Sequence, residues 1–142
     1  MGDGYQQASA ETRRRWGMLA EDVSTELAAA GLPVVPGMDA RVSAGVRVAI
    51  DPGSDATGGV YVEWRIHPWL SSAITRCTLQ HQAEAPVVRY GAHVADVMRE
   101  AIRQILTTGG FTVYESPNAL VAHMLYVASG PRGTLSERLQ LG

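Results

Sequence analysis

Two neighbouring segments, residues 42–50 and 60–67, alternate between apolar side chains and smaller or polar ones. Successive side chains of a β-strand point to opposite faces, so this period of two predicts a pair of strands that are buried on one face and wet on the other. One face of the second strand would carry Val60, Val62, Trp64 and Ile66, and the other would carry Tyr61, Glu63, Arg65 and His67. The turn signal Asp51-Pro52-Gly53 lies between them, which favours an antiparallel hairpin.

Helical spacing replaces this alternation on either side of the hairpin. Residues 9–30 place apolar side chains on one stripe, with Ser9 as a candidate N-cap and Gly31 as a stop signal. Residues 91–107 repeat the pattern and end at Gly109-Gly110, while Pro86 is assigned to the connector before them. We therefore expect two main helices.

The remaining segments are less distinct. Residues 71–82 suit a third strand better than a short helix, because Thr75, Cys77 and Leu79 alternate with polar neighbours. Residues 111–115 alternate as a strand. Residues 119–127 are interpreted as a buried strand, although Ser116-Pro117 is also a helix start. Near the end, residues 134–137 fit a capping box, so a short terminal helix is possible.

The order of these elements predicts the fold class. It is an α+β two-layer sandwich, with a mostly antiparallel sheet of four to five strands and two main helices on one face, in the order α-β-β-(β)-α-β-β. Residues 1–8 are expected to form a flexible lead, residues 9–130 a single domain, and residues 131–142 a tail. In this arrangement Trp64 should be buried between the layers and Trp69 more exposed.

Composition bears on the kind of partner and on the cell compartment that we expect for the chain. Twelve residues are basic, all of them arginine, against fourteen acidic residues, a balance that argues against nucleic acid as the main partner. The absence of lysine is typical of a GC-rich bacterial genome. A single cysteine, Cys77, excludes an intrachain disulfide and fits a reducing cytoplasm. No stretch is long and apolar enough for a membrane span, and Met1–Gln7 does not resemble a signal peptide.

No group of residues has the spacing of a catalytic or metal site. Cys77 and His81 form an isolated C-x3-H pair, whereas zinc needs three or four ligands. His93, Asp96 and Glu100 share a helix face, but such spacing is typical of a solvated surface. Phosphate-binding loops and nucleophile elbows are absent from the sequence. We therefore expect no metal or cofactor and favour a non-catalytic role.

Two sets of residues remain as candidate sites. The second face of the hairpin and the residue following Pro68 gather side-chain types that are enriched in interfaces: Tyr61, Glu63, Arg65, His67 and Trp69. The only basic run lies near the start of the first helix, where it is a candidate contact for an anionic partner: Arg13, Arg14 and Arg15.

These observations lead to a ranked expectation for function. Only 18% of the residues are charged, which leaves surface that tolerates a second subunit. The first hypothesis is a non-catalytic interaction module that forms a homodimer through its sheet, by the open face or an edge strand. The alternative is a small-molecule-binding protein or enzyme with a pocket near His67, Glu63 and Arg65, where glutamate and histidine would serve as general base and acid.

Overall fold

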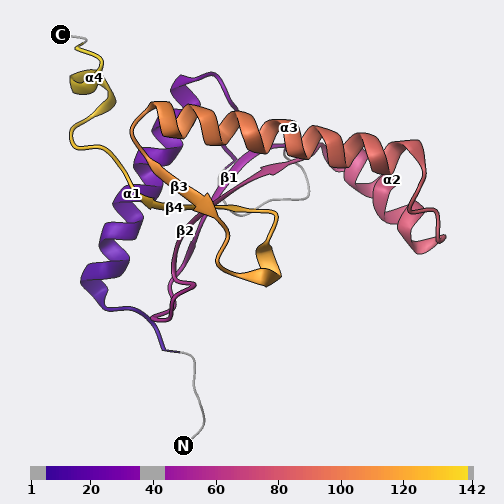
Figure 1. Cartoon of the computed structure of the whole chain (residues 1–142), viewed down its shortest axis with the longest axis horizontal. Helices are drawn as coiled ribbons and strands as arrows, with labels where there is room; N and C mark the ends of the chain where they lie inside the picture. Colours follow the sequence, from indigo (N-terminus) through magenta and orange to yellow (C-terminus); the bar gives the residue numbers. More distant parts are fainter. Residues whose placement is uncertain (1–5, 36–43, 141–142) are drawn as a thin grey trace, which may run out of the picture.

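The computed structural model describes residues 6–35 and 44–140. It is an α+β fold in which a four-stranded antiparallel sheet is covered on one face by two long helices (Figure 1). The helix α1 (Ala10–Ala29) packs on β1 (Gly45–Asp51) and β2 (Gly59–Arg65), and α3 (Pro86–Thr108) packs on β2 and β3 (Thr112–Glu115). The fourth strand, β4 (Leu125–Ser129), lies between β2 and β3, so the sheet order is β1-β2-β4-β3. The predicted fold class is confirmed.

The face of the hairpin that was expected to be dry is buried, whereas the face expected to be wet is buried at Tyr61 and only partly exposed beyond it. Val46 of β1 pairs with Trp64 of β2, and Val48 pairs with Val62. Val60 and Val62 are at most 1% exposed, and they form the core with side chains of β4, α1 and α3 that include Leu27, Ile102, Leu106, Leu125 and Val127. Trp64 packs against the edge of this core and is half-buried. The even-numbered positions of β2 therefore face the helices; the predicted strand start at Val42 lies outside the described residues.

The first helix follows its sequence signals closely. The Ser9 side chain accepts a hydrogen bond from the backbone N–H of Thr12, which satisfies one of the free donors at the start of α1. Val23 and Leu27 on its inner stripe are fully buried. Just before this helix, Gln6 and Ala8 exchange backbone hydrogen bonds with Ser54 and Pro52, so this part of the predicted lead lies beside the hairpin turn.

The prediction of a strand over residues 71–82 is wrong. Residues 71–79 belong to helix α2 (Pro68–Leu79), and residues 80–82 follow its end. Pro68 occupies the first helical position, and the His67 ring Nδ1 accepts a hydrogen bond from the backbone N–H of Trp69. The apparent alternation hid a helical stripe, since Leu70, Ile74 and Cys77 are spaced by four and three residues.

Two further boundaries differ from the prediction. The helix α3 begins at Pro86, five residues earlier than expected, because proline is well suited to the first helical position. Residues 119–127 are not one strand: Ala119–Val121 form a short 3-10 helix, η1, and β4 starts only at Leu125. The Asn118 side chain accepts a hydrogen bond from the Leu120 N–H, which favours a turn there.

The C-terminal segment contains the helix α4 (Leu135–Arg138), with the expected capping box between Thr134 and Glu137. Arg138 fixes its position by donating hydrogen bonds to a Glu26 carboxylate oxygen (2.6 Å) and to the Gly109 carbonyl oxygen (2.8 Å). These contacts join the tail to the ends of α1 and α3.

Candidate functional site

Glu63 is the centre of a charged cluster on the second face of the sheet. The register of the hairpin places Arg47 of β1 directly opposite Glu63 of β2, and the Arg47 Nε donates to Glu63 Oε1 over 2.6 Å. Arg65, two residues further along β2 and on the same face, approaches the same oxygen at 3.3 Å. The Glu63 side chain is 10% exposed, and each arginine side chain is 29% exposed. Two guanidinium groups thus enclose one nearly buried carboxylate.

His123 completes this cluster from the segment that precedes β4. Its Nε2 lies 2.8 Å from Glu63 Oε2. An ionised carboxylate only accepts hydrogen bonds, so Nε2 carries the proton and donates. The His123 side chain is 64% exposed. The carboxylate therefore orients an imidazole that remains open to solvent.

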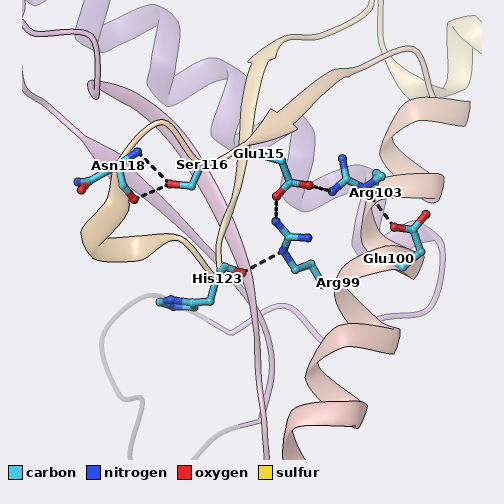
Figure 2. Close-up of polar contacts among 7 residues, drawn as sticks. All are labelled: Arg99, Glu100, Arg103, Glu115, Ser116, Asn118 and His123. Carbon is cyan, nitrogen blue, oxygen red and sulfur yellow. Dashed lines mark hydrogen bonds and ion pairs between the residues drawn. The ribbon is translucent and has the colours of Figure 1, made fainter.

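A second set of charges holds the segment between β3 and β4 in place (Figure 2). Arg99 and Arg103 of α3 both bind the Glu115 carboxylate at the end of β3, and the Arg99 Nε also donates to the His123 backbone oxygen over 3.2 Å. In the following turn, the Ser116 hydroxyl hydrogen-bonds to the backbone of Asn118. These contacts bring His123 within reach of a glutamate sixty positions earlier.

The environment of Glu63 stabilises its charged form. Burial alone raises the pKa of Glu63, but hydrogen bonds from Arg47 and His123 and their positive charges outweigh burial, so the net pKa is lowered. Glu63 is accordingly ionised at neutral pH. The arrangement can orient a histidine and attract an anion.

A hollow of about 460 Å³ lies next to this cluster, between the end of β2 and the first turns of α2. It lies where β4 is shorter than β2. The strand β4 pairs with β2 only over residues 60–62, so residues 63–65 pair with β1 on one side and have no β4 residue on the other. The hollow is lined by Glu63, Trp64, Arg65, Ile66, Pro68, Ser71 and Ser72. It combines a carboxylate, a guanidinium and two hydroxyl groups, which suits a polar ligand.

The other predicted residues of this face are not part of the hollow. Tyr61 is only 3% exposed: its hydroxyl donates to the Thr57 carbonyl oxygen over 2.5 Å, and its ring packs edge-on against Tyr126. His67 caps α2 with its ring nitrogen. Trp69 is 69% exposed on α2. Of the five predicted residues, the structure therefore places only Glu63 and Arg65 at the hollow. Tyr61, His67 and Trp69 lie elsewhere.

The arginine run at the start of α1 does not form a single patch. Arg13, Arg14 and Arg15 are all exposed, and consecutive positions fan around the helix. Arg13 donates to the Ala8 carbonyl oxygen, and Arg15 donates to the Thr12 hydroxyl.

No family model, curated protein or solved structure matches the chain. Across residues 6–35 and 44–140, His, Cys, Asp and Glu side chains do not gather in threes as metal ligands would. Within the same ranges, each helix is too short or too polar to span a bilayer.

Sequence reasoning missed Arg47, His123 and the two serines. Arg47 could have been found from the alternation in the first strand of the hairpin, because pairing the two strands places it opposite Glu63. The serines became candidates only once residues 71–82 proved helical. His123 gave no signal, since its approach depends on how α3 holds the β3–β4 segment.

Proposed function

We propose that this chain is a non-catalytic interaction module that pairs with a second copy of itself. The observation that carries the proposal is the exposure of large apolar side chains on α2 and the first half of α3. These two helices pack against each other, and α2 extends beyond the sheet beside α3 (Figure 1). We refer to residues 68–97 as the arm.

The arm has little core of its own. From Ser71 to Tyr90, a stretch that is described throughout, every residue is at least partly exposed to solvent. The side chains that stand out are Trp69 (69% exposed), Leu79 (76%), Tyr90 (61%) and Val97 (51%). Exposed apolar surface on a monomer is typical of a site where another molecule binds when it is large enough. We take these four side chains as the apolar surface that a second copy would cover.

The sheet offers less for pairing. Its second face carries the Glu63 cluster, and Tyr61 on that face is already covered. On the outer edge of β1, Val34 bridges to Val46 and Gln7 bridges to Gly53, so both ends of this edge are covered and residues 47–52 lie between them. The other edge strand, β3, is only four residues long. Partly covered and short edges resist strand addition. These observations favour the arm over the sheet as the site of self-association.

The test is the mass of the full chain in solution. Sedimentation equilibrium over roughly 1–100 µM, the range expected for a modest interface, should show a monomer–dimer equilibrium. Replacing all four exposed arm residues with serine (Trp69, Leu79, Tyr90 and Val97) should leave a folded monomer. A matched control, Leu120→Ser together with Met18→Ser, removes side chains that are 91% and 61% exposed outside the arm and should leave the dimer intact. A wild-type monomer across this range, or a dimer that survives the fourfold change, would refute the proposal.

A second candidate function rests on the hollow beside Glu63. We propose that it takes a small polar molecule, because Glu63, Arg65, Ser71 and Ser72 present charges and hydroxyl groups to one space. A thermal-shift screen with small carboxylates, phosphates, amines, nucleotides and divalent metal salts tests it, since a ligand at a hundredfold excess over its dissociation constant stabilises the fold by about 2.7 kcal/mol. Ser72→Leu, which fills the hollow, should abolish the shift, and Thr75→Leu on the same helix should not. A screen without any shift rejects this candidate.

A further inference from the structure

The helix α3 carries two apolar stripes. The inner stripe, Gly91, Ala95, Met98 and Ile102, turns toward α2 and the core; Gly91 lets the Ile74 side chain approach closely, and Ile102 is 1% exposed. The outer stripe lies one residue earlier in each turn and consists of Tyr90, Val94, Val97 and Ala101. Tyr90 and Val97 are more than half exposed, and Val94 and Ala101 are half-buried. Spacings of four, three and four residues are those of a coiled-coil seam.

We propose that two copies of the chain pair antiparallel along this outer stripe, about a twofold axis that passes between residues 95 and 96. This inference rests on the proposed function and specifies its surface and geometry. Each Tyr90 then packs on the partner's Ala101, and each Val94 packs on the partner's Val97.

Side-chain volume favours the antiparallel direction. In an antiparallel pair the largest side chain of the stripe meets the smallest, so the layers fill evenly. A parallel pair would place Tyr90 against the partner's Tyr90 and Ala101 against the partner's Ala101, which crowds one layer and leaves a void in another. Two copies of the outer stripe therefore fit together by volume only when the two helices run antiparallel.

Polar side chains along the border of the stripe agree with this pairing. His93 and Glu100 lie on the same flank of the stripe, seven residues apart, and both are exposed. The twofold axis brings His93 of one copy to within about 3 Å, measured along the helix axis, of the partner's Glu100, because two residues of α-helix rise that far. The same contact occurs twice by symmetry. Glu100 otherwise meets only side chains of its own helix in the described chain, Arg103 and Gln104.

The position of α2 leaves room for the partner. The outer stripe is rotated by about 100° around the α3 axis from the inner stripe. The partner's α3 and the chain's own α2 therefore approach adjacent sides of α3, as neighbouring helices do in a four-helix bundle. The seam is only about 16 Å long, since eleven residues separate its ends. A dimer of this size belongs to the weaker class of interfaces.

Two double variants separate this geometry from association through the arm in general. Tyr90→Ser with Val97→Ser removes the exposed part of the α3 stripe, and should raise the dimer dissociation constant about 100-fold, tenfold for each truncated side chain. Trp69→Ser with Leu79→Ser removes side chains of α2 that are more exposed, at 69% and 76%, and should change the dissociation constant less than about threefold. The reverse pattern would overturn the stripe while leaving the arm as the interface. A wild-type monomer would overturn both proposals.

Disulfide trapping tests the direction. In a Cys77→Ser background, Val94→Cys and Val97→Cys chains carrying tags of different mass are oxidised separately and as a mixture. Antiparallel pairing predicts that the mixture forms a heterodimeric disulfide between positions 94 and 97 and that neither chain links strongly to itself, because disulfides need Cβ atoms about 4 Å apart. Self-linking of each variant would indicate parallel pairing. Dimers that do not link in any combination would exclude the stripe.

Discussion

Replacing Glu63 with glutamine should destabilise the fold by about 2 kcal/mol at pH 7. A hydrogen bond to a charged group is worth about 1.5–3 kcal/mol, and the loss is reduced because the partners keep some contact with water. Glu63 accepts from Arg47 at 2.6 Å and from His123 at 2.8 Å, with its own side chain only 10% exposed. Glutamine keeps one acceptor oxygen but turns an amide donor toward a second donor. Urea denaturation, at one fixed protein concentration, measures the change in unfolding free energy.

The pH dependence of this loss identifies its cause. The pKa of Glu63 is lower in the folded chain than in the unfolded chain, so the ionised carboxylate stabilises the fold above the unfolded pKa. This stabilisation declines as the pH falls below about 4.3, the ordinary value for glutamate, and is lost as the pH passes through the folded pKa. Glutamine does not titrate, so the wild type and Glu63→Gln should converge in acid.

The matched control is Glu84→Gln. Glu84 pairs with Arg89 on the arm, but the two side chains are 86% and 70% exposed, so the change should stay within about 0.5 kcal/mol. A loss for Glu63→Gln as small as that of this control would refute the view that the cluster stabilises the sheet. A loss of the same size at pH 7 and in acid would refute its electrostatic origin.

Three further outcomes follow from local geometry. Gly59→Ala should cost about 1–3 kcal/mol in urea denaturation, because φ is +137° there and an added Cβ would lie 2.7 Å from the Tyr126 hydroxyl. Gly17→Ala, inside α1 with nothing within 4 Å of the added carbon, should instead stabilise by about 0.5–1 kcal/mol. In chains with a single tryptophan, Trp64 should emit at shorter wavelength than Trp69, which is 69% exposed; equal emission maxima would contradict the placement of Trp64 against the core.

The hairpin was predictable because a strand that is buried on one face has an apolar side chain at every second position of its sequence. Val46, Val60 and Val62 follow this rule and are at most 1% exposed. The same rule led to the error over residues 71–82, where Thr75, Cys77 and Leu79 alternate with polar neighbours although the chain is helical as far as Leu79. The contact that decides between strand and helix is long-range: Ile74 packs against Gly91 of α3. A local pattern does not contain that information.

The candidate site was predictable only in part, for a similar reason. Glu63 and Arg65 stood out as charges on the alternate face of a strand. Tyr61 stood out equally, yet it is buried, because Tyr126 of β4 packs across it and the neighbouring turn accepts its hydroxyl hydrogen bond. Which residues share a face follows from strand period, whereas which of them are covered depends on strand order and on the path of the β3–β4 segment.

The low charge content of the chain is most marked in one helix of the fold. The helix α2 carries one charged residue, Arg76, in twelve positions, and its outward side chains include Trp69 and Leu79. A helix that stays in water normally carries charge on its outward face, because apolar side chains there leave surface that water solvates poorly. The least charged α-helix is therefore also among the least covered. In the pairing that we propose, the twofold seam runs along the neighbouring face of α3, so Trp69 and Leu79 of α2 lie beside the seam and not within it.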